Sequence, residues 1–294
     1  MLETLESCPS CGHQSFQPYI TCEDYTVSHE KFHIVKCDNC TLLFTNPRPQ
    51  SENLGQYYQS EDYISHTNTA TNLIGLLYKT VRSFALKSKV KLINKVASKG
   101  RLLDYGCGTG QFLNAAKANG WLINGVEPSA SARENIQLNI RAVVTDHLDR
   151  TKTPQKFNII TLWHVLEHLT DLRHTLSTLV NKLATTGKLI IAVPNAESYD
   201  AQLYTEHWAA YDVPRHLYHF TQKSLAQLLE SLNLQIDFIE PMIFDSFYVS
   251  LLSEKHKNRK SNYLKSFING YKSNSYAKKN NSNYSSLVYV ISKK

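Results

Sequence analysis

Apolar positions change their spacing along the chain. From about residue 100 onward, short apolar runs alternate with segments whose apolar residues recur at three- and four-residue steps. The runs are typical of buried strands and the recurring steps of amphipathic helices. Strands are predicted at 102–105, 122–126, 142–145, 157–162, 188–193, 235–239 and 287–291, and helices at 71–98, 111–119, 129–139, 171–184 and after an N-cap at Thr221 through Leu232. This alternation predicts an α/β fold with a mostly parallel sheet covered by helices on both faces.

The first 46 residues have a different character. They are rich in aromatic residues and hold two Cys-x-x-Cys pairs, Cys8/Cys11 and Cys37/Cys40, separated by 25 residues. Four thiolates at this spacing indicate a closed, tetrahedral structural zinc site. A set of bare thiols and an iron site are the alternatives. Cys22 and Cys107 are expected to be small buried residues.

Pattern and composition divide the chain into three parts. Residues 1–49 are predicted to form a zinc-ribbon segment, 50–99 a linker and a helix that packs on the core, and 100–294 the core, with an insertion at 241–285. Residues 270–286, full of Ser, Asn, Lys and Tyr, come nearest to low complexity.

Charge is concentrated at the C-terminal end. Residues 251–294 hold ten Lys or Arg and one acid, Glu254, whereas the chain as a whole has a net charge of +7. The remaining residues are therefore close to neutral, and the chain does not have the composition of a generally basic nucleic-acid binder. Residues 1–46 are acidic, which makes the cysteine-bearing segment a poor phosphate binder and favours a structural lid.

A glycine-rich loop follows the strand at 102–105. Asp104-Tyr105-Gly106-Cys107-Gly108-Thr109-Gly110 leads from this strand into a helix, which permits a tight turn and close backbone approach to a ligand. Gln111 leaves the dinucleotide fingerprint incomplete, and Asp104 disfavours a pyrophosphate, so a dehydrogenase is a weak alternative. Glu127 ends the next strand, where a carboxylate can accept hydrogen bonds from ribose hydroxyls.

These motifs support a resemblance. Leu103–Phe112, Asn124–Ser129 and Phe157–Leu169, with its Val165-Leu166-Glu167-His168 signature, resemble three motifs of the class I S-adenosylmethionine-dependent methyltransferases. The two cysteine pairs followed by Tyr57-Tyr58 are similar to a bacterial subgroup that includes sugar methyltransferases and enzymes found with surface-polysaccharide biosynthesis. The resemblance covers about residues 75–240 and implies a Rossmann-like seven-stranded sheet with S-adenosylmethionine as cofactor.

The resemblance also assigns roles to residues. It places the three loop glycines at the methionine and ribose portions of the cofactor, Asp104 near its amino group, Glu127 on the ribose, and Asp146 with His147 beside the adenine. The full predicted cofactor set is Asp104, Gly106, Cys107, Gly108, Gly110, Glu127, Pro128, Asp146, His147 and Trp163.

Residues 208–221 are the first candidate for catalysis. They follow the fifth strand and are dense in groups that can move protons, and histidine titrates near neutral pH. His216 is the predicted base, by similarity to the sugar methyltransferases. Those enzymes carry an acid before the histidine, whereas this chain has Arg215. The alternative is a packed loop in which a histidine caps the next helix, with His219 as the candidate cap.

Other candidates lie beside the cofactor motifs. His164 could reach the pocket from a strand end. Tyr58 and Tyr63 could reach over it from the linker, or they could pack as aromatic residues between the ribbon and the core. His168 with Glu167 is expected to bond backbone, and no third group argues for a metal there. The basic residues of the insertion could face an anionic acceptor, or they could simply be solvated.

The predicted function is transfer of a methyl group from S-adenosylmethionine to a small molecule, such as a nucleotide-linked sugar or a polysaccharide precursor. An RNA or tRNA methyltransferase that uses the basic C-terminal segment is the first alternative, and a non-catalytic zinc-ribbon binding protein is the second. Met1 to Glu6 hold no basic region leading into an apolar stretch, and no apolar run is long enough for a membrane helix. Cytoplasmic localisation is therefore expected, without membrane insertion.

Overall fold

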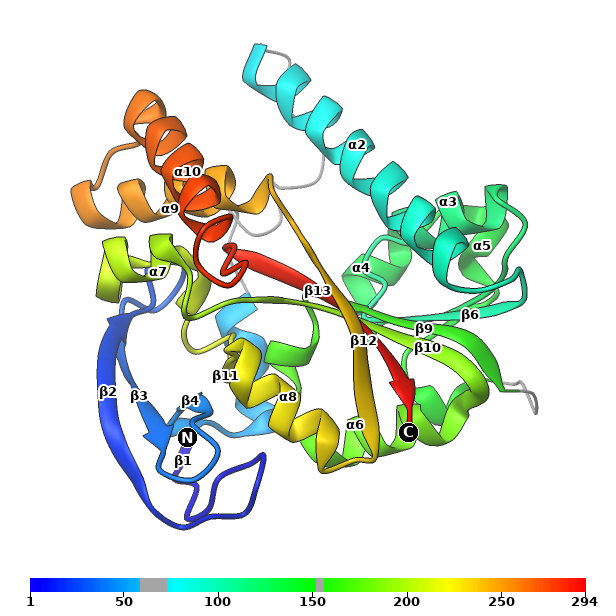
Figure 1. Ribbon diagram of the computed structural model, residues 1–294, viewed down its shortest axis with the longest axis horizontal. Helices are drawn as coiled ribbons and strands as arrows, with labels where there is room; N and C mark the ends of the chain where they lie inside the picture. The colour runs from blue at the N-terminus through cyan, green and yellow to red at the C-terminus, as the bar shows by residue number, and fades with distance from the viewer. Residues whose placement is uncertain (59–72, 152–155) are drawn as a thin grey trace.

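A computed structural model describes residues 1–58, 73–151 and 156–294 of the chain, with side chains from residue 82 onward in helix α2. Seven strands form the central sheet in the order β12-β13-β10-β9-β6-β7-β8 (Figure 1). The strands are β6 (Arg101–Tyr105), β7 (Leu122–Val126), β8 (Val144–Thr145), β9 (Phe157–Trp163), β10 (Leu183–Pro194), β12 (Leu234–Pro241) and β13 (Ser286–Lys293). Strands β8, β7, β6, β9 and β10 pair in parallel, whereas β13 is antiparallel to both β10 and β12. The predicted mostly parallel, seven-stranded sheet is confirmed.

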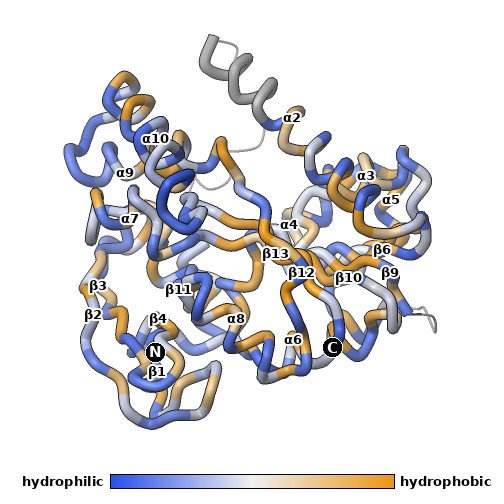
Figure 2. The backbone as a smooth tube through the Cα atoms, viewed as in Figure 1, coloured by the Kyte–Doolittle hydropathy of each residue, from blue (hydrophilic) through white to orange (hydrophobic). Residues whose placement is uncertain are grey.

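Helices cover both faces of the sheet (Figure 1). Helices α2 (Leu73–Val96), α3 (Gln111–Ala118), α4 (Ala130–Glu134) and α5 (Leu138–Arg141) lie on one side, and α6 (Leu172–Lys182) and α8 (Gln222–Glu230) on the other. Neighbouring strand residues such as Ile159 and Ile160 belong to opposite cores, because side chains alternate across a strand. Figure 2 shows the resulting apolar strands between polar helix surfaces.

Two segments differ from the prediction. The helix expected at 129–139 is broken into α4 and α5, because Ile136 turns into the core at 2% exposure and lies near Gly110. Within the insertion, α9 (Asp245–Asn258) and α10 (Tyr263–Ala277) form a helical hairpin, and the last turns of α10 fall in the 270–286 stretch that is nearest to low complexity. Helix α7 (Tyr199–Tyr204) packs against both.

The N-terminal segment shares a sheet with the core. Strands β2 (Phe16–Glu23), β3 (Lys31–Cys37) and β4 (Leu43–Thr45) form a four-stranded sheet with β11 (Tyr218–His219), which comes from the loop between β10 and α8. A small pairing of β1 (Leu2–Glu3) with β5 (Arg48–Pro49) precedes the short helix η1 (Ser51–Tyr58). The division at residue 49 stays a prediction, but strand pairing joins the two sides of it.

A buried ion-pair network reinforces this junction. Arg215 is 1% exposed and donates to Asp24 at 2.9 Å, to Asp212 at 2.6 Å and to the Tyr57 carbonyl at 2.9 Å. Asp24 is fully buried, and it also accepts hydrogen bonds from the backbone amides of Thr26 and Ser28. Burial would raise the pKa of Asp24, but the Arg215 bond and these amides outweigh it and lower the pKa. The guanidinium thus holds the N-terminal segment against the 208–221 loop.

Replacing Arg215 should therefore destabilise the fold. In Arg215→Met, the Asp24 carboxylate stays buried without its countercharge, and the free energy of unfolding should fall by about 3–5 kcal/mol, as measured by urea denaturation. The matched control is Lys294→Met, which removes an exposed ion pair with Glu230. It should change the free energy of unfolding by less than about 1 kcal/mol. Equal stability of the Arg215 variant and the parent would show that the network does not hold the junction.

Candidate active site and cysteine cluster

The glycine loop turns sharply between β6 and α3. Gly106, Gly108 and Gly110 all have positive φ, at 74°, 54° and 74°, which side chains rarely adopt. A Cβ on Gly106 would also collide with the side chain of Val165. The loop is anchored by the Gly106 and Cys107 amides, which both donate to the Val126 carbonyl at the end of β7.

Glu127 lies directly beside this loop. Its two carboxylate oxygens accept from the Gly108 amide and the Ser129 amide, each at 2.8 Å. The carboxylate is half-buried and keeps further lone pairs, so it can also accept from ligand hydroxyls. The sequence placed Glu127 and the loop at the same sheet edge, and the structure brings them into hydrogen-bond contact.

Asp104 lies at the bottom of the loop and is 2% exposed. Burial raises the pKa of this carboxyl to about 7, although the Thr161 hydroxyl donates to it at 2.6 Å. The nearby Lys89 ammonium opposes the shift and lies 4.4 Å from the centre of the Trp163 ring. The indole Nε1–H of Trp163 is buried and has no hydrogen-bond partner among the residues that the structure describes. A cationic amino group beside Asp104 would stabilise its ionised form.

The remaining predicted cofactor residues lie at the same edge. Asp146 accepts from Arg150 at 2.6 Å, and His147 is exposed. Pro128 is exposed, and its carbonyl accepts from Arg133. Cys107 is buried, and burial raises the pKa of its thiol, which makes it an inert small residue.

His164 follows β9 with a positive φ of 56°. Its Nδ1 lies 3.4 Å from Glu167, and its Nε2 lies 3.3 Å from Asp245 at the start of α9. Burial alone would lower the pKa of His164, but the two carboxylates raise it to about 9. The two carboxylates therefore favour the protonated ring, and they connect the insertion to the sheet edge through His164. A catalytic role for His164 stays a prediction.

His216 and His168 face each other, with ring centres 4.5 Å apart. His216 Nδ1 lies 2.8 Å from the Ala210 carbonyl, and because a carbonyl only accepts, Nδ1 carries the proton. This leaves Nε2 of His216 as the nitrogen with a free lone pair, 4.0 Å from Asp212. The loop thus holds His216 in the tautomer that a general base requires.

His168 lies between this loop and the linker. Its Nδ1 is 3.0 Å from both the Arg215 carbonyl and the Tyr58 hydroxyl. Burial and the neighbouring His216 imidazole lower the pKa of His168 to about 4, so it stays neutral. The predicted backbone bond of His168 is present. Tyr58 contacts His168, and its reach over the pocket stays a prediction. Tyr63 lies outside the described residues.

Glu167, His168 and His216 converge, with one potential ligand atom from each within 4.8 Å of the others. The sequence analysis found no third potential metal ligand beside Glu167 and His168. In the structure, His216 is that third group. Within the described part of the chain, the two buried oxygens of Glu167 have only the His164 ring, at 3.4 Å, as a polar side-chain contact, and this contact outweighs burial and lowers the pKa of Glu167. The three groups could hold a cation or share a proton, and the fixed tautomer of His216 favours the second role.

One alternative for the 208–221 loop, that a histidine caps the next helix, is wrong. The cap of α8 is Thr221, whose side chain accepts from the Ser224 amide in a capping box, and no histidine takes this place. His219 is a buried strand residue of β11, and its Nε2 is 3.2 Å from the Thr45 hydroxyl. Burial lowers the pKa of His219 well below its usual value. The predicted N-cap at Thr221 is confirmed.

Sequence reasoning gave no role to several residues that contact the site. Lys89 approaches from α2, and Asp212 contacts His216 from an αL conformation with φ 38°. Asp245 was placed in the insertion, but its partner His164 was not foreseen. No sequence signal joins these residues, because each contact depends on how distant elements pack.

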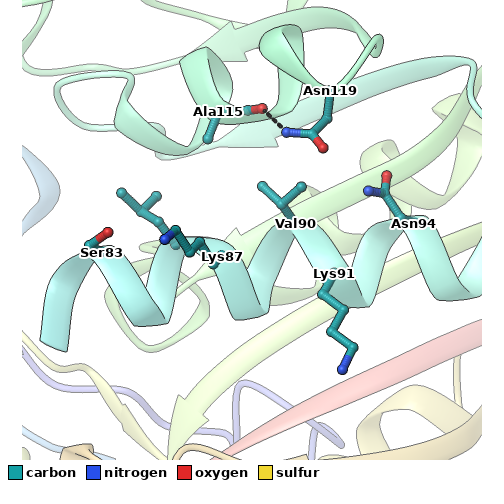
Figure 3. Close-up of a pocket in the computed structure, with 8 residues that line it drawn as sticks. Ser83, Lys87, Val90, Lys91, Asn94, Ala115 and Asn119 are labelled. Atoms are coloured by element: carbon teal, nitrogen blue, oxygen red, sulfur yellow. Dashed lines mark hydrogen bonds between the residues drawn. The ribbon is translucent and has the colours of Figure 1, made fainter. Parts of the chain in front are cut away.

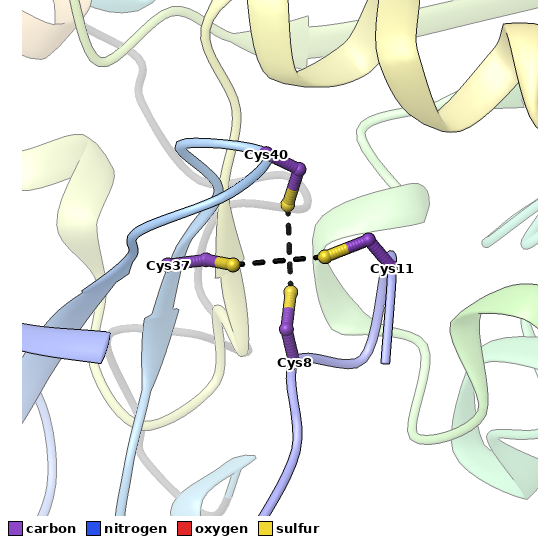
Figure 4. A group of neighbouring side chains, drawn as sticks. All are labelled: Cys8, Cys11, Cys37 and Cys40. Carbon is purple, nitrogen blue, oxygen red and sulfur yellow. Dashed lines mark hydrogen bonds between the residues drawn. The ribbon is translucent and has the colours of Figure 1, made fainter. Parts of the chain in front are cut away.

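The four predicted metal ligands form one cluster (Figure 4). All four Sγ atoms lie within 4.8 Å of one another, and the Cys8–Cys40 and Cys11–Cys37 separations are 3.5 and 3.6 Å. A tetrahedral zinc ion with Zn–S bonds of about 2.3 Å requires Sγ atoms about 3.8 Å apart, so the cluster fits zinc. The Cys8 bond lowers the pKa of Cys40 to about 5, which favours the thiolate that binds metal.

A groove of about 500 Å³ lies elsewhere, between α2 and α3 (Figure 3). It is lined by Ser83, Leu86, Lys87, Val90, Lys91, Asn94, Ala115 and Asn119. None of these is a predicted site residue. Among the described residues, no helix combines the length and apolarity that crossing a membrane requires.

Comparisons with known proteins agree with the fold. Residues 79–237 match the family described as a methyltransferase domain. The chain is 33% identical over 125 residues to a ubiquinone biosynthesis O-methyltransferase of Coxiella burnetii, which is 40% of this chain and 53% of that protein. A protein of the same name from Rhodopseudomonas palustris is 27% identical over 104 residues, 32% of this chain and 40% of that protein. The chain thus spans about half the length of the curated relatives it matches.

A solved structure extends the likeness in fold. Magnesium protoporphyrin IX methyltransferase from Synechocystis PCC 6803, with bound SAH, superposes with a TM-score of 0.50 and 14% identity, covering 81% of this chain and 97% of that one. The family match covers more than half of the chain and includes the glycine loop, Glu127 and the Val165–His168 signature. The chain therefore belongs to the methyltransferase-domain family, with the class I S-adenosylmethionine-dependent methyltransferase fold.

Proposed function

We propose that this chain transfers a methyl group from S-adenosylmethionine to an oxygen of a small molecule. The observation that carries the proposal is the Glu127 carboxylate, fixed by the Gly108 and Ser129 amides beside the glycine turn. It can accept from paired ribose hydroxyls. Asp104 at the bottom of the loop suits the amino group of the same cofactor, and the half-buried Trp163 lines the strand end beside it.

The proposed chemistry needs little from the protein beyond alignment and a base. Bound S-adenosylmethionine supplies an activated methyl group on its sulfonium sulfur. Nε2 of His216 accepts the proton of the acceptor hydroxyl, while the Ala210 carbonyl holds the ring in place. Tyr58, bonded to His168, lies beside the base and is the proposed orienting group. His164, held cationic by two carboxylates, is proposed to position α9 rather than to take a proton.

The acceptor is proposed by chemical class. The curated relatives are named as O-methyltransferases, which supports an oxygen acceptor. The nucleotide-linked sugar expected from the sequence stays one candidate within that class, and hydroxylated aromatic molecules are the other. The RNA alternative rested on basic residues of the C-terminal segment, eight of which lie between 255 and 279, on and beside the α9–α10 hairpin.

Zinc is the proposed occupant of the cysteine cluster. The separations of 3.5 and 3.6 Å between sulfur atoms and the absence of an open fourth position support a structural ion. The cluster would hold the loops of the N-terminal sheet, which carries Asp24 on the far end of β2.

The cofactor site is tested by calorimetry with SAH. Glu127→Ala should weaken SAH binding roughly ten- to a hundredfold, because hydrogen bonds to a charged group contribute about 1.5–3 kcal/mol. The SAH affinity of Glu127→Gln should lie between those of the parent and Glu127→Ala. The control Glu134→Ala, which replaces an exposed acid on α4, should bind SAH like the parent. Binding of NAD in place of SAH would refute the assignment.

The base is tested by the rate of SAH release with panels of nucleotide sugars and hydroxylated aromatic molecules. His216→Asn should lower the rate by about 10²–10⁴-fold while SAH binding stays within about twofold. His174→Asn on α6, which replaces an exposed histidine, should keep the parent rate. An unchanged rate in the His216 variant would remove it from the mechanism.

Metal content tests the cysteine cluster. The purified protein should carry about one zinc ion per chain by plasma mass spectrometry, and chelation should lower its melting temperature. Cys11→Ser, which replaces the exposed cysteine, should lose the ion, whereas Cys22→Ala should keep it. Equal zinc in the parent and Cys11→Ser would contradict the site.

A further inference from the structure

Helix α10 carries its apolar residues on the wrong side for a globular protein. Its buried positions hold small residues, most of them polar: Ser266, Asn269, Gly270, Ser273 and Ala277. Its large apolar residues face outward instead: Tyr263, Leu264, Phe267, Ile268 and Tyr271 are 58%, 72%, 62%, 42% and 63% exposed. At 3.6 residues per turn, these five positions form one stripe opposite the buried positions. We call this stripe the apolar face of α10.

The inverted orientation is fixed by specific contacts. Ser273 donates to Asp200 at 2.7 Å, and Asn269 donates to the Tyr204 hydroxyl at 2.9 Å. A Cβ on Gly270 would collide with Phe247 of α9, so the two helices pack closely there. Rotating α10 to bury its apolar face would break these bonds and leave the buried Asp200 with fewer partners. The exposed face is therefore a property of the fold.

Positive charge surrounds the apolar face. Residues 255–279 contain eight exposed Lys or Arg and no acid: Lys255, Lys257, Arg259, Lys260, Lys265, Lys272, Lys278 and Lys279. Arg259 pairs with Glu23 and Lys265 pairs with Glu254, which leaves a net positive charge around the face. Two copies of the chain meeting through this face would bring like charges together, which opposes self-association. A partner that complements both the apolar face and the positive charge around it has an apolar interior and an anionic surface.

We propose that the α9–α10 hairpin docks the protein on an anionic lipid membrane surface. Tyrosine and phenylalanine suit the boundary between lipid headgroups and acyl chains, and each lysine near an anionic surface adds about 1 kcal/mol. The hairpin lies at one end of the molecule, on the opposite side from α3 and α5 (Figures 1 and 2). It leaves the body of the protein clear of the membrane.

Docking would also bring the candidate active site near the lipid. Helix α9 begins at Asp245, which contacts His164 at the sheet edge at 3.3 Å. The hairpin therefore connects the membrane surface with the edge where the acceptor would bind. An amphiphilic acceptor held in the membrane fits this arrangement. The docking itself does not rest on the proposed methyl transfer, because binding is measured without cofactor.

The test is co-sedimentation of the full chain with vesicles. We expect binding to phosphatidylcholine vesicles that contain about 30% phosphatidylglycerol, little binding to phosphatidylcholine alone, and weaker binding as salt increases. Replacing Leu264, Phe267 and Tyr271 together with serine should weaken binding by at least about tenfold, because each apolar side chain loses its burial in lipid. These residues are exposed, although the Phe267 ring also contacts Phe247 of α9, so circular dichroism checks that the triple variant keeps the fold of the parent.

Matched variants separate the face from general effects. Leu138→Ser, 81% exposed on α5, should bind like the parent. Lys260→Glu with Lys272→Glu should weaken binding, whereas Lys31→Glu with Lys223→Glu, both outside the hairpin, should not. The proposal is overturned if the parent does not sediment with anionic vesicles, or if the triple variant binds as well as the parent. It is also overturned if light scattering finds a dimer that the triple variant dissociates, or if RNA binds and vesicles do not.

Discussion

The arrangement of the site depends on the buried ion pairs of the Arg215 guanidinium. Almost fully buried, it needs both Asp24 from the N-terminal sheet and Asp212 from its own loop, because an unpaired charge at that depth would be far too costly. These two ion pairs fix the position of the 208–221 loop, in which His216 directly follows Arg215. The Arg215 carbonyl then holds His168. One ion pair therefore joins the cysteine-bearing segment to the candidate base.

The sheet edge combines groups whose ionisation is set by their neighbours. Two carboxylates keep His164 cationic, whereas burial and a neighbouring imidazole keep His168 neutral. Between them, the Ala210 carbonyl leaves one nitrogen of His216 able to accept a proton. Burial holds Asp104 near the midpoint of its titration at neutral pH, so the charge of a bound ligand can set its state. The edge can thus bind a cation and move a proton within one small volume.

Local patterns predicted what strand order and motif spacing determine. Adjacent parallel strands end at one edge, so the glycine loop and Glu127 had to meet, and paired cysteines had to converge. The contact of His216 with His168 could not be foreseen, since it depends on the 208–221 loop folding back onto the turn after β9, where the Leu217 amide donates to the Glu167 carbonyl. Helix α10 escaped prediction for a different reason: its buried side is small and mostly polar, so its composition resembles a solvated segment.

The central claim is that the carboxyl edge of the sheet is the working site, and amide hydrogen exchange with and without SAH tests it most directly. The account predicts slower exchange at residues 104–110 and 126–129 and in the 163–168 turn after β9, with the groove between α2 and α3 unchanged. Protection confined to that groove, or no protection anywhere in zinc-loaded protein, would contradict the account.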